Sequence, residues 1–93
     1  MACYKTSPAA DNDLENIWFY GLGRFGVEQA DKYYHELMFH FDDLAENPLS
    51  YPAVGHIREG YRRSVFGVHS VFYKICDDNI EIMRIIGRQD YSE

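Results

Sequence analysis

Five arginines between residues 58 and 88 are the residues whose type and spacing best suit chemistry on an anion. They are Arg58, Arg62, Arg63, Arg84 and Arg88. A guanidinium is planar and permanently charged, and its several N–H donors match carboxylate and phosphate groups. If the strands that carry them pair as a meander, these side chains could meet on one side of the sheet, where they could bind phosphates or acidic side chains of a target. The alternative is that they pair with nearby carboxylates as solvated surface charges, which contribute little stability.

Acid–base groups that could work beside these arginines are scarce. Cleavage of RNA by its 2'-hydroxyl needs a base, an acid, and cations that stabilise the negative phosphorane. His69 and Tyr73 fall inside a predicted strand, where packing is the more frequent role, and Tyr91 is a single phenol in the tail. We therefore predict no catalytic residue. An RNA-cleaving site built from Arg84, Arg62 and Tyr91 is the alternative.

The net charge of −6 is unevenly distributed along the chain. Residues 1–56 carry three basic and nine acidic side chains, whereas residues 57–93 carry six of each. Affinity for nucleic acid comes largely from neutralising phosphates, so this balance disfavours docking on RNA and direct, sequence-specific nucleic-acid binding.

Local signals define two helices and a strand before them. Residues 2–6 are apolar and β-prone, and predict a short strand. Ser7 followed by Pro8 is typical of a helix start, and Gly26 predicts both its end and the start of a second helix. Apolar residues at helical spacing continue that second helix to the Asn-Pro pair at residues 47–48.

Three β-branched and aromatic runs follow the helices. They cover residues 57–66, 68–76 and 80–86, separated by Gly67 and by an Asp-Asp-Asn turn at residues 77–79. Runs of this length with short polar or glycine turns are typical of antiparallel hairpins.

The order of these elements predicts an α+β fold for residues 1–93 as a single domain. A short N-terminal strand and a helical hairpin would pack on an antiparallel β-meander. Simple alternation along the last strand places Arg84 on the same face as Ile82 and Ile86. A charge among isoleucines needs a partner, so we expect one for Arg84.

The two helices carry more aromatic rings than one buried face holds. Most aromatics at helical spacing are core residues, but the excess suits a partner that buries exposed rings. Phe19 and Phe39 lie off the main apolar stripes. The candidates for partner binding are Trp18, Phe19, Tyr34 and Phe39.

Other classes of protein lack support in the sequence. Cys3 and Cys76 have no metal or redox spacing, and the histidines at positions 35, 40 and 56 form no metal-binding pattern. We expect no metal and no cofactor. The N-terminus lacks an apolar signal region and no stretch is long enough to span a membrane, so we expect a cytoplasmic protein without membrane contacts.

Five segments, taken in their order along the chain, resemble the toxins of bacterial toxin–antitoxin modules in the RelE/ParE superfamily. The segments are SPAADNDLENIWFY, RFGVEQADKYYHEL, LAENP, IREGYRRSVFGVHSVFY and IEIMRIIGRQD. The chain is most similar to the ParE, or plasmid-stabilisation, branch. This resemblance implies a RelE/ParE-like fold, a cognate ParD-like antitoxin that neutralises the toxin in a hetero-oligomer, and DNA gyrase as the target.

The resemblance also frames the alternatives. The RelE branch cleaves mRNA on the ribosome, and Gly87 stands where relatives often have a histidine after the last strand. We therefore expect a gyrase-poisoning binding protein rather than a nuclease, with a ribosome-dependent endoribonuclease as the alternative. A third possibility is an antitoxin-bound module that has lost its toxicity.

Overall fold

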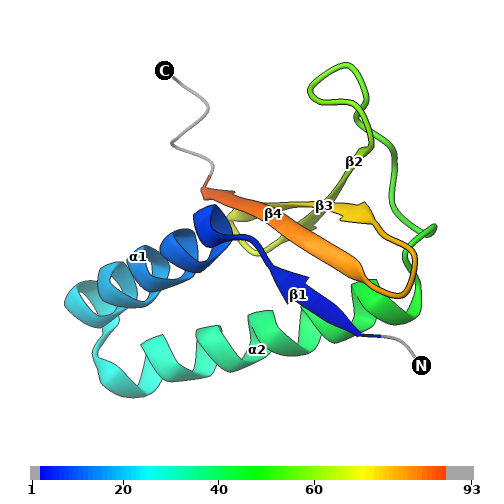
Figure 1. Ribbon diagram of the computed structural model, residues 1–93. Coiled ribbons are helices and arrows are strands. Elements are labelled where there is room, and N and C mark those ends of the chain that lie inside the picture. The colour runs from blue at the N-terminus through cyan, green and yellow to red at the C-terminus, as the bar shows by residue number, and fades with distance from the viewer. Residues whose placement is uncertain (1–2, 88–93) are drawn as a thin grey trace.

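Two helices pack on one face of a four-stranded sheet in the computed structural model, which describes residues 3–87 (Figure 1). In chain order the elements are β1 (Tyr4–Thr6), α1 (Pro8–Phe25), α2 (Val27–Glu46), β2 (Tyr61–Phe66), β3 (His69–Ile75) and β4 (Ile80–Gly87). The sheet order is β1-β4-β3-β2, with β2, β3 and β4 antiparallel and β1 parallel to β4. The predicted α+β fold is confirmed, and β1 adds a parallel edge strand to the meander.

The helical hairpin begins and turns where its local sequence predicts. The Ser7 hydroxyl caps α1 by accepting the Ala10 amide at 3.0 Å, and Pro8 needs no N–H partner in the first turn. Gly26 has φ of 91°, which side chains disfavour, and it ends α1 immediately before α2. The second helix ends at Glu46, two residues before Pro48.

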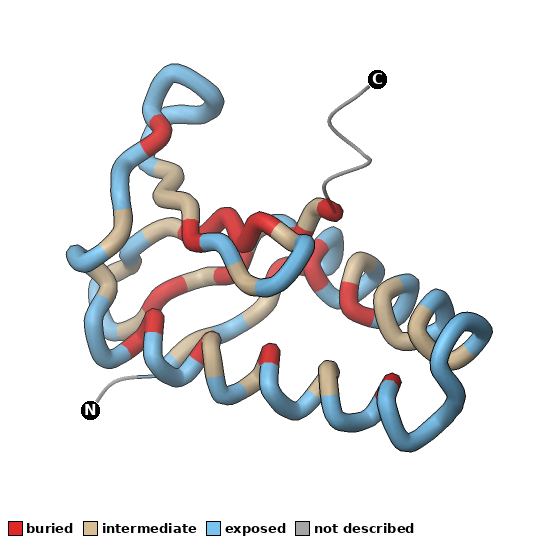
Figure 2. The backbone as a smooth tube through the Cα atoms, turned by 180° about the vertical axis from the view of Figure 1, so that it is seen from behind, coloured by how far each residue is buried: buried red, intermediate tan, exposed pale blue. Residues whose placement is uncertain are grey.

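The core lies between the hairpin and the sheet. Buried positions recur along the side of α2 that faces the strands (Figure 2). The fully buried Leu37 and Phe41 belong to the same cluster as Val71, Tyr73 and Ile82 of the sheet. Neither helix within residues 3–87 combines the length and the apolar character needed to cross a bilayer.

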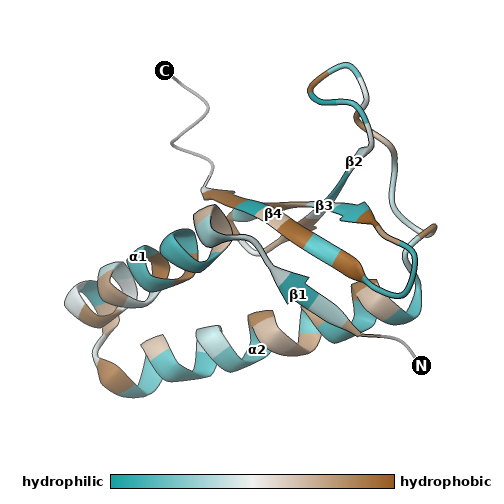
Figure 3. Cartoon of the chain, viewed as in Figure 1, coloured by the Kyte–Doolittle hydropathy of each residue, from teal (hydrophilic) through white to brown (hydrophobic). Residues whose placement is uncertain are grey.

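A β-bulge in β4 determines which residues face the helices. Tyr73 pairs with Ile82 and Phe72 pairs with Arg84, so Met83 is an extra, unpaired residue. Hydrophilic residues interrupt the hydrophobic stretches of β4 (Figure 3). The bulge shifts the alternation of the residues after it, so Ile85 is buried in the core and Arg84 is exposed. The predicted placement of Arg84 beside Ile82 was therefore wrong, since it assumed an uninterrupted strand.

The segment before β2 also differs from the prediction. Residues 57–60 form turns rather than the start of a strand, and Ile57 is 56% exposed. The Tyr61 amide closes one of these turns by donating to the Arg58 carbonyl at 3.1 Å. Arg58 therefore lies in a loop, because local turn hydrogen bonds outweigh the strand preference of this run.

Candidate functional site

Arg63, Phe72 and Arg84 form a row across three strands on the sheet face opposite the helices. Arg63 pairs with Phe72 in the β2–β3 ladder, and Phe72 pairs with Arg84 in the β3–β4 ladder. Both neighbours of Phe72 on β3, Val71 and Tyr73, belong to the core on the other face. Phe72 itself is only 4% exposed. We call this feature the arginine row. It places one arginine on each side of the buried Phe72 ring.

Asp13, in the second turn of α1, holds Arg84 in this row. Its carboxylate accepts Arg84 Nε at 2.7 Å and Nη2 at 3.2 Å, a bidentate pair. The same carboxylate accepts the Ile85 amide at 2.9 Å. The partner expected for Arg84 is thus Asp13, and the contact also fastens α1 to β4.

Ser7 fixes the bulge that turns Arg84 outward. Its hydroxyl donates to the Met83 carbonyl at 2.9 Å, and its amide donates to the Ile82 carbonyl at 2.9 Å. The same hydroxyl is the cap of α1. The start of the helix and the bulge are therefore held by one buried side chain.

Arg62 and Arg58 do not join the arginine row. Arg62 is on the opposite face of β2, because successive strand residues alternate, and its Nη1 donates to the Tyr51 carbonyl at 2.6 Å. The Arg58 guanidinium lies over the Tyr61 ring at 5.9 Å. Arg88 lies outside the described residues. The expectation of a single cluster containing Arg62 and Arg58 was therefore wrong, and the structure unites Arg63 with Arg84.

The candidate acid–base side chains are on the helix-facing side of the sheet. Tyr73 is fully buried and its hydroxyl donates to the Pro48 carbonyl at 2.8 Å, and burial raises its pKa to about 12. His69 Nδ1 lies 2.7 Å from the Tyr33 hydroxyl. Burial, with a smaller effect of Glu36, raises the pKa of Tyr33 to about 12, so this phenol stays protonated at neutral pH. Tyr91 lies outside the described residues.

Three of the four predicted partner-binding aromatics line one groove between α1 and α2. The groove has a volume of about 560 Å³ and is lined by Asp11, Leu14, Glu15, Trp18, Phe19, Asp31, Tyr34 and His35. Trp18 Nε1 donates to Asp31 Oδ1 at 2.8 Å and thereby links the two helices. Phe19 is 58% exposed. We call this feature the hairpin groove.

Phe39 extends the aromatic surface along α2. It follows His35 by four residues, so it lies one helical turn beyond the hairpin groove, and it is 73% exposed. The predicted exposure of Phe19 and Phe39 is confirmed. Whether these rings bind a partner stays a prediction.

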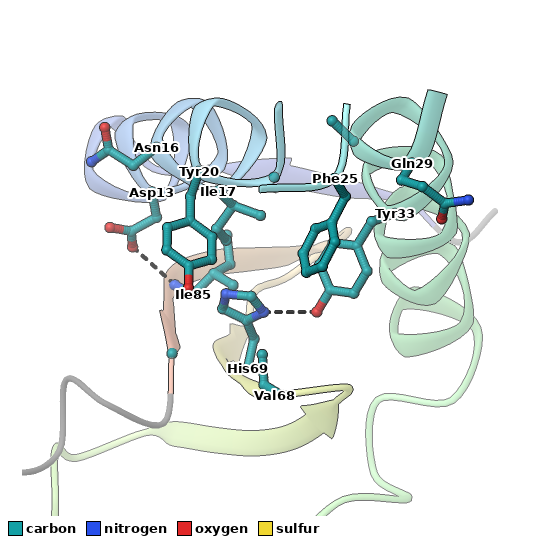
Figure 4. A pocket seen from close by; sticks show the side chains of 13 residues that line it. Asp13, Asn16, Ile17, Tyr20, Phe25, Gln29, Tyr33, Val68, His69 and Ile85 are labelled. Atoms are coloured by element: carbon teal, nitrogen blue, oxygen red, sulfur yellow. Dashed lines mark hydrogen bonds between the residues drawn. The ribbon is translucent and has the colours of Figure 1, made fainter. Parts of the chain in front are cut away.

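Sequence reasoning missed a larger pocket near the turn of the hairpin (Figure 4). Its volume is about 920 Å³, and Figure 4 shows Tyr20 and Phe25 of α1, Tyr33 of α2 and His69 of β3 around the same space. The aromatic residues near Gly26 were the available signal. This signal was weak, because the pocket also needs Ile85 and Gly87 of β4, which are far from the hairpin in sequence.

Within residues 3–87, no group of three or more histidine, cysteine, aspartate or glutamate side chains is arranged to hold a metal ion. The arrangement offers hydrogen-bond donors, aromatic rings and charges, which suit protein recognition.

Comparisons with known sequences match this chain to one family of proteins. The family model of the ParE toxin of the type II toxin–antitoxin system parDE matches residues 4–91. Toxin ParE1 of Mycobacterium tuberculosis (strain H37Rv) is 39% identical over 84 residues, which is 89% of this chain and 86% of the relative. Toxin ParE1 of Caulobacter vibrioides is 40% identical over 86 residues, which is 92% of this chain and 88% of the relative.

Solved structures support the same fold. The chromosomal ParDE toxin–antitoxin system from P. aeruginosa matches with a TM-score of 0.81 at 20% identity, covering 94% of this chain and 96% of that one. The RelBE2 toxin–antitoxin complex from Mycobacterium tuberculosis matches with a TM-score of 0.62 at 22% identity, covering 94% and 98%. Because the family match spans nearly the whole chain and both relatives align along most of their length, this chain belongs to the ParE toxin family of type II toxin–antitoxin systems.

Proposed function

We propose that this toxin acts by binding DNA gyrase and stabilising the cleaved-DNA state of that enzyme. Membership of the ParE family carries the proposal, and the arginine row provides a surface for it. Arg63 and Arg84 flank a buried ring on the sheet face opposite the helices, where they can contact carboxylates or phosphates of a large target. Arg58, Arg62 and Arg88 remain secondary candidates.

A ParD-like antitoxin neutralises the toxin in the bacterial cytoplasm by forming a hetero-oligomer with it. The similarity to the P. aeruginosa ParDE system supports an antitoxin of this kind. The aromatic rings of the hairpin groove and the exposed Phe39 are the surface that we assign to it. Aromatic side chains concentrate binding energy at protein interfaces because they bury large areas at low entropic cost.

The antitoxin surface is tested by a matched pair of variants. Phe39 and Leu49 are each 73% exposed, so Phe39→Asp and Leu49→Asp place a charge at equally accessible positions. We expect Phe39→Asp to weaken antitoxin binding about tenfold or more, and Leu49→Asp to change it less than threefold. Equal effects of the two substitutions would remove Phe39 from the interface.

The ribosome-dependent endoribonuclease is the alternative that the experiment must separate. His69 and Tyr73 lie on the helix-facing side of the sheet, whereas the arginine row lies on the opposite side. Cells in which expression of the toxin has been induced are divided between a gyrase cleavage assay and primer extension on translated messages. Trapped cleaved DNA without new message ends supports gyrase. New message ends without trapped DNA support the nuclease, and normal growth with neither supports loss of toxicity.

A further inference from the structure

The hairpin groove combines the exposed Phe19 ring and the partly buried Trp18 and Tyr34 rings with an acidic rim. Asp11 and Glu15 contribute from α1 and Asp31 from α2. None of these three carboxylates takes part in a salt bridge within residues 3–87. Asp31 accepts Trp18 Nε1, and Asp11 accepts the Thr6 hydroxyl, so their hydrogen-bond donors in the structure are neutral groups.

The surrounding hairpin reinforces the negative field. Residues 7–47 contain nine acidic side chains and two basic ones, Arg24 and Lys32. His35 also lines the groove, and its Nδ1 lies 2.8 Å from the Asp31 carbonyl one turn earlier. An acidic segment that covered the rings would place its carboxylates beside those of the rim, and like charges repel. A neutral segment would remove water from the rim carboxylates without supplying a cation, which also costs free energy.

We propose that the hairpin groove receives a basic segment of the antitoxin. An apolar side chain of that segment packs against Trp18, Phe19 and Tyr34, while lysine or arginine side chains on either side of it pair with Asp11, Glu15 and Asp31. This inference rests on the proposed neutralisation by an antitoxin and adds the charge of the segment that binds. Rim charges of this kind act mainly on association rate and partner choice.

Crosslinking reads the chemistry of the occupant directly. Phe19→p-benzoylphenylalanine places a photoreactive ring at the exposed edge of the groove, and the purified full-length antitoxin of the same module is the probe. We expect the captured antitoxin peptide to contain more lysine and arginine than aspartate and glutamate. Capture of a peptide with net negative charge would overturn the inference.

Charge substitutions provide a second, quantitative readout. Glu15 is exposed and makes no salt bridge within the described residues, so Glu15→Lys and Glu15→Gln should fold normally. Glu46→Lys makes the same change of net charge at an exposed position at the end of α2, outside the groove. At low salt we expect about a tenfold loss of affinity for Glu15→Lys, about threefold for Glu15→Gln, and less than twofold for Glu46→Lys.

The salt dependence and the controls separate this inference from the proposed function. The wild-type affinity and the Glu15→Lys deficit should both shrink as salt is raised, because exposed ion pairs are screened. Equal effects of Glu15→Lys and Glu46→Lys, with the antitoxin still bound to wild-type toxin, would defeat the basic-segment inference alone. An antitoxin that fails to bind the wild-type toxin would defeat the proposed neutralisation and, with it, the inference.

Discussion

Replacing Asp13 tests how the fold positions the arginine row. The Asp13 side chain is 11% exposed, and its carboxylate accepts the Ile85 amide and two N–H groups of Arg84. In Asp13→Ala the nearly buried Ile85 amide loses its acceptor, which costs about 1–3 kcal/mol. The pair with Arg84, whose side chain is 47% exposed, adds about 1 kcal/mol or less after solvent screening. We therefore expect Asp13→Ala to lower the free energy of unfolding by about 1–4 kcal/mol.

Asp13→Asn separates the two contributions. Its amide oxygen still accepts the Ile85 N–H, so only the charge interaction with Arg84 is lost and the cost falls to about 1 kcal/mol. Glu15→Ala on the same helix, at an exposed position, should change stability by about 0.5 kcal/mol or less. Urea denaturation followed by circular dichroism measures all three variants. Asn and Ala variants of equal stability would show that the Ile85 hydrogen bond does not hold α1 to β4.

Further predictions concern the glycine turns and a half-buried histidine. A Cβ at Gly67, where φ is +58°, would lie 2.9 Å from the Tyr33 hydroxyl, whereas one at Gly60, where φ is +84°, meets nothing within 4 Å. Both alanine substitutions lose about 1–2 kcal/mol of stability because their φ is positive. The contact with Tyr33 adds to this loss only at Gly67, so Gly67→Ala should lower the thermal unfolding temperature more than Gly60→Ala. Equal decreases would contradict the contact. His40 Nε2 lies 2.6 Å from the Ser64 hydroxyl, and burial lowers the pKa of His40 despite the opposing charge of Asp43. Since the unfolded chain binds that proton more readily, stability should fall as pH drops below about 6.5, and His40→Gln should flatten this dependence in urea titrations. An unchanged pH profile would assign the loss to other groups.

Local sequence signals predicted the parts of the fold that depend on neighbouring residues. Ser7 and Pro8 define the start of α1 and Gly26 its end, because capping and positive φ are properties of a few consecutive residues. The meander follows from short turns between β-prone runs. The exposure of Phe19 and Phe39 follows from their positions off the apolar stripe of each helix.

The features that sequence reasoning missed depend on residues far apart in the chain. Asp13 and Arg84 are separated by 71 positions, and the bulge at Met83 is held by Ser7 at the other end of the chain. A pattern of period two along β4 contains no sign of that bulge, so it placed Arg84 on the wrong face. The split between Arg62 and Arg63 was predictable from strand alternation alone, and only the assumption of a single cluster obscured it.

The most direct test of the proposed function is a DNA cleavage and supercoiling assay with purified gyrase and purified toxin. We predict inhibited supercoiling and accumulation of linear, gyrase-linked DNA, both reversed by the antitoxin. Arg63→Glu should weaken both effects, and Lys32→Glu, an equal charge change at an exposed position on α2, should not. Normal supercoiling with no linear DNA at a saturating concentration of folded toxin would contradict gyrase as the target.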